Sequence, residues 1–156
     1  MIHRIRKGKH RCWPVKIGLT KRDFHKWKVR FNLSCVYNTG NDDINKLCGF
    51  GYLWNMHEES ARFGWRWNTT KGCIELFSYC YIRGMRVSHF MADLEINNLY
   101  EISLTKLENS YRFIALGVTY FEQGVNHKKK WKYPANFFFG GDSPAPHLVK
   151  VEIEKV

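Results

Sequence analysis

The chain has 156 residues, 44% of them hydrophobic and 25% charged, a composition typical of a single globular domain with its own apolar core. It excludes a disordered tail, a collagen-like fibre and a coiled coil. No run approaches the roughly 18 consecutive apolar residues that a membrane-spanning helix needs. Lys and Arg number 25 against 14 Asp and Glu, so the formal net charge is +11.

The first part of the chain carries most of this excess. Residues 1–30 hold many Lys and Arg side chains and a single acidic one, Asp23. We expect residues 1–14 to form a basic arm and residues 15–156 to form one domain. Such an arm is typical of contact with a polyanion, that is, nucleic acid, an acidic glycan or an acidic neighbouring subunit; the alternative is a solvated arm that keeps the protein soluble. With a second basic cluster near residue 130, the predicted polyanion-binding residues are Arg4, Arg6, Lys7, Lys9, Arg11, Lys128, Lys129 and Lys130.

Beyond this segment, apolar and polar side chains alternate with a period of two. Residues 27–37 place their apolar side chains on one face and predict a half-buried antiparallel strand. Residues 73–82 are apolar or aromatic on both faces and predict a central strand covered on both sides. Residues 89–99 are the best helical candidate, although they fit a bend entering a strand equally well. Residues 111–121 and 148–156 are again typical of strands.

Turn residues separate these runs, chiefly Gly, Asn, Asp and Pro. Many short strands divided by turns predict an all-β fold, a two-sheet antiparallel β-sandwich.

The densest aromatic and polar segment is residues 52–67. Alternation within it places Phe63 and Trp65 on one face and Arg62 on the other. In one interpretation the rings belong to the core and the arginines to an exposed face. In the other, aromatic rings pack against sugar rings while polar groups hold the hydroxyls. The predicted ligand-binding residues are Trp54, Asn55, His57, Arg62, Arg66, Trp131 and Tyr133.

The order of motifs in residues 73–153 points to a fold family. A strand leads into residues 97–104, a turn precedes residues 111–117, and a Gly-Gly turn with a Pro-rich stretch precedes a closing strand at 147–153. This order resembles the concanavalin A-like (laminin-G-type) β-sandwich, or jelly roll. The resemblance implies two curved antiparallel sheets. It leaves the function open, because the family includes lectins, glucanases, lyases and purely structural modules.

Catalytic motifs are sparse. Sandwich glucanases use an ExDxxE-like run of carboxylates, which this sequence lacks, although Asp93 and Glu95 would share a strand face. Residues 120–127 are similar to the Tyr-Phe-Lys-x-Gly strand of jelly-roll alginate lyases, with Glu122 in place of the lysine and without the partner Arg and Gln-Ile-His strands. We therefore predict no catalytic residue and keep a polysaccharide lyase or glycoside hydrolase as an alternative.

The cysteines predict buried free thiols and a reducing compartment. Their number, 5, is odd, and neither a CxxC pair nor a Cys/His pair with zinc spacing occurs. Residues 41–43 could supply oxygen ligands to a cation, but a turn needs the same residue types; we predict no metal and no cofactor. No apolar run suited to a secretory signal follows the basic N-terminus, so we expect synthesis in the cytoplasm and no membrane partner.

Two functional hypotheses of different class follow. The first is a non-catalytic, lectin-like module that binds a carbohydrate or an acidic glycan. The second is a structural or decoration component of a virion, such as a phage particle, whose basic arm contacts a neighbouring protein subunit or, non-specifically, nucleic acid. Phage proteins are made in the cytosol and are released by lysis, which would explain free thiols without a secretory signal. The two are compatible, since a lectin-like sandwich can be mounted on a particle.

Overall fold

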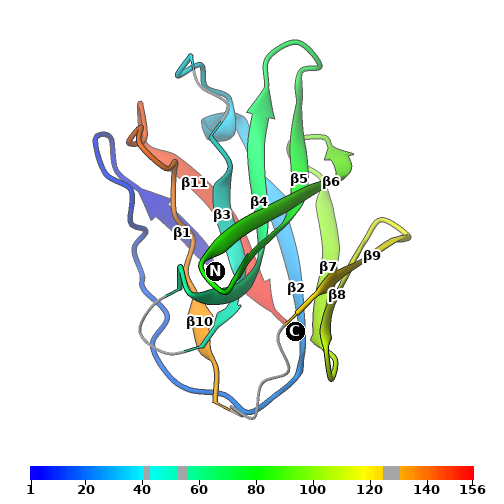
Figure 1. Ribbon diagram of the computed structural model, residues 1–156. Coiled ribbons are helices and arrows are strands. Elements are labelled where there is room, and N and C mark those ends of the chain that lie inside the picture. Colours follow the sequence, from blue (N-terminus) through cyan, green and yellow to red (C-terminus); the bar gives the residue numbers. More distant parts are fainter. Residues whose placement is uncertain (41–42, 53–55, 125–130) are drawn as a thin grey trace.

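A computed structural model describes residues 1–40, 43–52, 56–124 and 131–156. The chain forms two antiparallel sheets that face each other (Figure 1). One sheet has six strands in the order β1-β11-β2-β7-β8-β9, and the other has five in the order β10-β3-β4-β5-β6. The predicted β-sandwich is therefore confirmed. Within the described part of the chain, no helix is long and apolar enough to cross a membrane.

Tight turns connect the consecutive strands between residues 59 and 123, whereas the other connections are longer. The six-stranded sheet consists of β1 (Ile2–Ile5), β11 (Val149–Lys155), β2 (Phe24–Phe31), β7 (Leu99–Lys106), β8 (Ser110–Ala115) and β9 (Val118–Gln123). The five-stranded sheet consists of β10 (Tyr133–Ala135), β3 (Asn45–Gly51), β4 (Glu59–Asn68), β5 (Cys73–Ile82) and β6 (Met85–Leu94). A 3-10 turn, η1 (Leu33–Cys35), follows β2.

Aromatic rings from both sheets fill the core. The Trp65 ring of β4 lies 5.2 Å from the Phe31 ring of β2, and the Phe63 ring lies 5.2 Å from the Phe113 ring of β8. These four side chains are fully buried, and burying a large apolar side chain contributes about 1.5–3 kcal/mol. The interpretation that the β4 rings are core residues is confirmed. Arg62, which directly precedes Phe63, then points to the outer face of the sheet.

The structure differs from the predicted strands at residues 27–37 and 111–121, and at residues 89–99 it has the bend entering a strand and not the helix. The strand expected over residues 27–37 ends at Phe31, because the Asn32 side chain accepts a hydrogen bond from the backbone N–H of Ser34 and starts a 3-10 turn. As a result Leu33, expected in the core, is 72% exposed. Residues 89–99 form the end of β6 and a turn, and the run at 111–121 is divided between β8 and β9.

The basic N-terminal segment lies along the sandwich. Its residues 2–5 form the edge strand β1, which pairs with β11. The chain then folds back, so that the backbone N–H groups of Arg4 and Trp13 each donate to the other's carbonyl, at 2.9 and 2.8 Å. At the turn, Gly8 adopts a positive φ of 72° and its N–H donates to the Ala145 carbonyl at 2.8 Å. We refer to residues 4–13 as the N-terminal hairpin.

Candidate functional site

A groove of about 720 Å³ lies on the outer face of the five-stranded sheet. Its floor is formed by side chains of four neighbouring strands: Lys46 of β3, Arg62 of β4, Tyr79 and Tyr81 of β5, and Arg86 of β6. Strand pairing sets their positions, since Arg62 is paired with Tyr79 and Tyr81 with Arg86. Side chains on one face of a sheet that come from paired residues lie next to each other. The floor is therefore both cationic and aromatic.

The groove is bordered on one side by the segment that follows β10. Phe138 in this segment exchanges two backbone hydrogen bonds with Lys46, at 2.8 and 2.9 Å. The next turn is held by the Asp43 carboxylate, which accepts the N–H groups of Gly141 and Asp142 at 3.0 and 3.1 Å. Burial acts to raise the pKa of Asp43, but these hydrogen bonds outweigh it and the pKa is lowered. This carboxylate is thus committed to the wall of the groove.

Arg62 is the most unusual residue of the floor. Its side chain is only 6% exposed, and its guanidinium lies 5.0 Å from the Tyr79 ring and 5.4 Å from the Tyr81 ring. The Nε and Nη2 atoms find no hydrogen-bond partner among the described residues. A buried charged group without hydrogen bonds is costly, so such groups normally have a partner. These two atoms are closed off from solvent, so a partner from the groove reaches them only when the covering side chains move.

Close backbone packing at Gly49 helps to position Arg62. Gly49 has a φ of +150°, which side-chain-bearing residues rarely adopt, and a Cβ there would lie 2.6 Å from the Arg62 Cα. Only glycine satisfies both conditions, so the β3 backbone can approach β4 closely at this point.

Lys46 lies beside Arg62 and is also largely buried, at 8% exposure. Its Nζ donates to the Gly140 carbonyl at 2.9 Å and lies 5.2 Å from the Tyr79 ring. Burial, together with the neighbouring charge of Arg62, lowers the pKa of Lys46 to about 8. The ammonium therefore titrates near the physiological range, whereas an exposed lysine would not.

The aromatic part of the floor stays neutral. Burial raises the pKa of Tyr79 to about 12. The His57 ring, which lines the groove, lies 4.8 Å from the Tyr81 ring, and its pKa is lowered by burial and by the charges of Arg62 and Lys46. At neutral pH the groove thus presents cations together with uncharged rings.

Two of the predicted ligand-binding residues, His57 and Arg62, line this groove. Arg66 lies further along β4, where its Nε donates to the Glu75 carboxylate at 2.6 Å and its guanidinium lies over the Phe77 ring. Trp131 does not line the groove; the Lys21 Nζ lies 4.4 Å from its ring centre.

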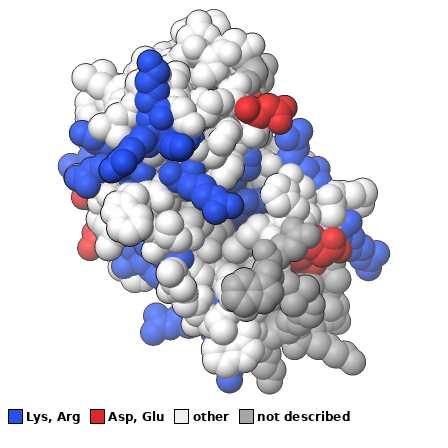
Figure 2. All heavy atoms as spheres, turned by 90° about the vertical axis from the view of Figure 1, so that its left-hand side faces the viewer, with Lys and Arg blue, Asp and Glu red and all other residues white. Residues whose placement is uncertain are grey.

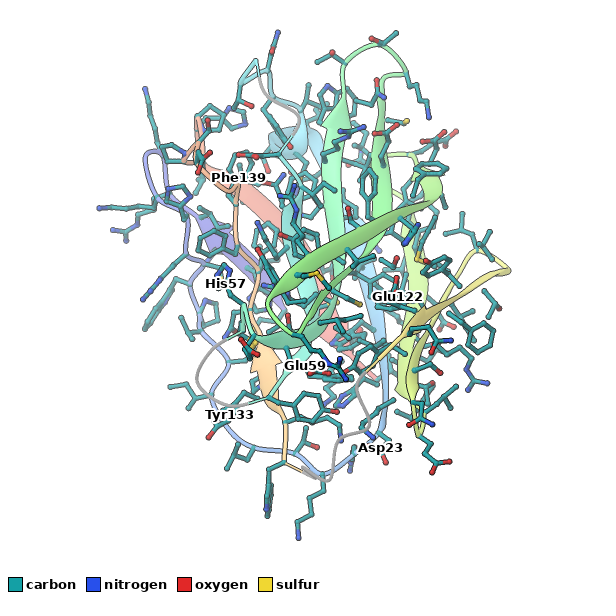
Figure 3. The ribbon with its side chains drawn as sticks, viewed as in Figure 1. Asp23, His57, Glu59, Glu122, Tyr133 and Phe139 are labelled. Carbon is teal, nitrogen blue, oxygen red and sulfur yellow. The ribbon has the colours of Figure 1, made fainter. Side chains whose placement is uncertain are left out.

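Tyr133, at the start of β10, lies nearer than His57 to the lower end of the sandwich, where Asp23 is also found (Figure 3). It does not line the groove either. Trp54 and Asn55 fall outside the described residues. Of the predicted ligand-binding residues that the structure describes, His57 and Arg62 line the same groove, whereas Arg66, Trp131 and Tyr133 do not.

Sequence reasoning missed Lys46, Tyr79, Tyr81 and Arg86. The strand predicted over residues 73–82 is confirmed as an interior strand that is buried on both faces over residues 74–80, but its pattern did not indicate that its outer-face tyrosines line a groove. The available signal was chemical: alternate positions on that face are tyrosines, which combine a ring with a hydroxyl. Lys46 carried no such signal, because only the pairing of β3 with β4 brings it to Arg62.

The segment resembling an alginate lyase strand lies elsewhere. Tyr120 and Glu122 belong to β9, at the edge of the six-stranded sheet, and do not line the groove. The Glu122 carboxylate instead lies 3.3 Å from the His89 Nε2 of β6. Residues 125–127 lie outside the described part of the chain.

The predicted polyanion-binding residues of the first segment gather around the N-terminal hairpin. Figure 2 shows this side of the molecule, on which Lys and Arg dominate over Asp and Glu. Arg11 borders both the groove and the surface of the hairpin. Lys128, Lys129 and Lys130 lie outside the described residues.

Comparison with known proteins gives the fold class. No family model and no curated protein sequence matches the chain. Among solved structures, the alginate lyase vAL-1 from Chlorella virus has a TM-score of 0.61 at 13% identity, covering 99% of this chain and 81% of that one. The alginate lyase AlyC3 has a TM-score of 0.61 at 6% identity, with 99% and 74% covered. The alginate lyase A1-II', of polysaccharide lyase family 7, has a TM-score of 0.53 at 8% identity, with 87% and 63% covered.

These similarities establish a concanavalin A-like, jelly-roll β-sandwich, as the motif order predicted. At such low identity they define the fold alone. The class of protein is thus a jelly-roll sandwich with a cationic, tyrosine-lined groove on its five-stranded sheet.

Proposed function

We propose that the groove binds an acidic polysaccharide, a chain that contains uronate sugars. The observation that carries this proposal is the buried guanidinium of Arg62, which lines the groove and whose Nε and Nη2 find no hydrogen-bond partner among the described residues; a ligand reaches these two atoms when the side chains that cover them move. A guanidinium is a planar fork of donors that matches the two oxygens of a carboxylate. A uronate carboxylate would supply the missing acceptors and compensate the buried charge.

The neighbouring side chains suit the rest of a sugar chain. Tyr81, which is partly exposed, offers a ring for the apolar face of a sugar and a hydroxyl for hydrogen bonds, while the buried Tyr79 supports Arg62 and Lys46 from below. Lys46 and Arg86 add positive charge within the same groove, which favours a ligand with repeated negative charges. The three alginate lyases that share the fold act, by their names, on an anionic polysaccharide, which agrees with this ligand class.

The first test compares two arginines on one face of β4. Arg62→Gln is expected to weaken binding of polymannuronate about tenfold or more, because a charge-assisted hydrogen bond in a buried site is lost. Arg66→Gln removes the same charge from a position outside the groove and should change the affinity less than about twofold. Isothermal titration calorimetry measures both, and circular dichroism checks that each variant is folded.

Equal losses in the two variants would mean that only the overall charge matters and would contradict the proposed site. Unchanged binding by Arg62→Gln would contradict it as well. A neutral polysaccharide such as a glucan should bind neither the wild-type protein nor the variants, since nothing in it would compensate the guanidinium.

A second candidate function, β-elimination on the bound polysaccharide, is favoured by one observation: Lys46 has a pKa of about 8 and lies beside both Arg62 and Tyr79. A lysine with a lowered pKa can act as a general base near neutral pH. Arg62 would neutralise the uronate carboxylate and so acidify the proton on C5. Tyr79, whose pKa is raised to about 12, retains a proton that it can donate.

In this reaction each broken bond and each transferred proton would be accounted for. Lys46 takes the C5 proton, the released electron pair forms the C4=C5 double bond, the C4–O bond breaks, and the leaving oxygen takes the proton of Tyr79. The product contains a conjugated double bond that absorbs ultraviolet light. We expect a rise in absorbance with polymannuronate if the groove is catalytic, and loss of that rise in Lys46→Met. Binding without any rise in absorbance would leave the lectin-like function alone.

A further inference from the structure

The five-stranded sheet is continued sideways by two extended segments. Phe138, in the first of these segments, pairs with Lys46 of β3. On its other side Phe138 pairs with Arg11, which belongs to the second segment. The Phe139 N–H also donates to the His10 carbonyl at 2.9 Å, and the His10 and Phe138 rings stack at 5.4 Å. Because neighbouring extended segments lie about 4.8 Å apart, Arg11 lies roughly 10 Å across the sheet from Lys46.

On the far side of Arg11 the surface is hollowed a second time. This hollow, of about 700 Å³, is bordered by the basic side chains of the N-terminal hairpin, by Trp13 and by Leu148, with no acidic residue among the described residues at its border. Trp13 is 74% exposed. The basic side chains form no ion pair with any described residue. They are Arg4, Arg6, Lys7, Lys9 and Arg11. Figure 2 shows positive charge extending over this side of the molecule.

Arg11 links the two surfaces, because it borders both the groove and the hollow. We infer that the N-terminal hairpin holds the continuation of the same acidic polysaccharide, so that one extended chain crosses the groove at Arg62 and runs on over the hairpin. This inference rests on the proposed function. It adds that the ligand is a long uronate polymer, with carboxylates facing the hairpin cations and a sugar ring packing against Trp13.

The test uses chain length to separate the two surfaces. A tetrasaccharide of mannuronate can occupy the groove alone, whereas a dodecasaccharide reaches the hairpin. The triple variant Arg6→Gln/Lys7→Gln/Lys9→Gln should weaken dodecasaccharide binding about tenfold and change tetrasaccharide binding less than about twofold. Dodecasaccharide binding by the triple variant should also depend less steeply on salt concentration, because fewer counterions are released.

The matched control is Lys26→Gln/Lys28→Gln/Arg30→Gln, which removes three charges from the outer face of β2. It should leave both affinities within about twofold, since this face is distant from the groove and its charges are paired with Glu101 and Glu152. An equal loss in the control and the hairpin variant would overturn the inference, because it would indicate a general charge effect.

Three other results are decisive. If the wild-type protein binds the tetrasaccharide but binds the dodecasaccharide no more tightly, the proposed function of the groove is supported and the inference about the hairpin fails. If neither oligosaccharide binds, the proposed function itself fails. If single-stranded DNA displaces the dodecasaccharide from the wild-type protein but not from the triple variant, and binds more tightly than the sugar, then the hairpin is a nucleic-acid surface and the inference is overturned.

Discussion

Arg62 and Lys46 illustrate how a binding residue can oppose stability. Each is a cation with less than a tenth of its surface exposed, and they lie close enough for the charge of Arg62 to lower the pKa of Lys46. Desolvation and like-charge repulsion both disfavour this arrangement in the unliganded protein. An anionic ligand reverses both effects. The groove is therefore a place where folding free energy is given up so that binding free energy can be gained.

The burial of His25 leads to a prediction about how the stability of the fold depends on pH. It is buried in β2, where its Nε2 donates to the Arg22 carbonyl at 3.0 Å and its ring lies 5.2 Å from the Phe50 ring. Burial, followed by the charge of Lys155, lowers the pKa of His25 from 6.5 to about 4. Between these two values the unfolded chain binds a proton that the folded chain does not, so acidification through this window destabilises the fold.

We therefore expect the free energy of unfolding to fall by about 3 kcal/mol, at 1.36 kcal/mol per unit of pKa, as the pH drops from about 6.5 to about 4. In His25→Phe, which keeps a ring beside Phe50, this part of the pH dependence should disappear. Urea unfolding at a series of pH values measures it. The same slope in both proteins would show that other groups account for acid sensitivity.

Among the elements, β1 differs most from expectation. The first fourteen residues were expected to be an arm, because their basic side chains obscure a very short alternation in which His3 and Ile5 are buried while Arg4 is not. Two buried positions are too few for a pattern to predict a strand. What forms β1 is its partner: β11 offers an open edge, and residues 2–5 occupy it.

This pairing predicts that the segment stabilises the sandwich. Deletion of residues 1–11 should lower the Tm by about 10 °C, because it removes the fully buried Ile5 and exposes the edge of β11. The triple variant of the hairpin should leave the Tm within about 2 °C, since its side chains are exposed. Differential scanning calorimetry distinguishes the two cases. An unchanged Tm in the deletion would mean that the segment is a basic arm that adds little to the stability of the sandwich.

The elements that the sequence predicted well are those whose pattern is long. β4 alternates over residues 62–67, which was enough to separate the core rings from Arg62, and β5 is apolar or aromatic over most of its ten residues, which was enough to predict a strand covered on both sides. The floor of the groove was only partly predictable for the opposite reason. Lys46, Tyr79 and Arg86 are adjacent through strand pairing between residues far apart in the chain, and alternation along one strand contains no information about its neighbours.

At the scale of the whole molecule, the positive charge is distributed by face. On the outer face of the six-stranded sheet, basic residues are matched by acids, as in the pairs Lys26–Glu101 and Arg30–Glu152. Among the described residues, the cations of the N-terminal hairpin form no ion pair, and the groove is lined by more basic than acidic side chains, the acidic ones being Asp43 and Asp142. The net charge therefore acts from one side, which would orient the protein toward a polyanion during their encounter. That the protein is a component of a virion stays a prediction, and so does its synthesis in the cytoplasm.

The burial of the thiols has a practical consequence. Cys12, Cys35, Cys48 and Cys80 are buried, while Cys73 at the start of β5 is partly exposed. A maleimide dye should thus attach selectively at one natural position, without engineering. Cys73 does not line the groove, so the attached dye would not block it, and its fluorescence polarisation would follow sugar binding directly.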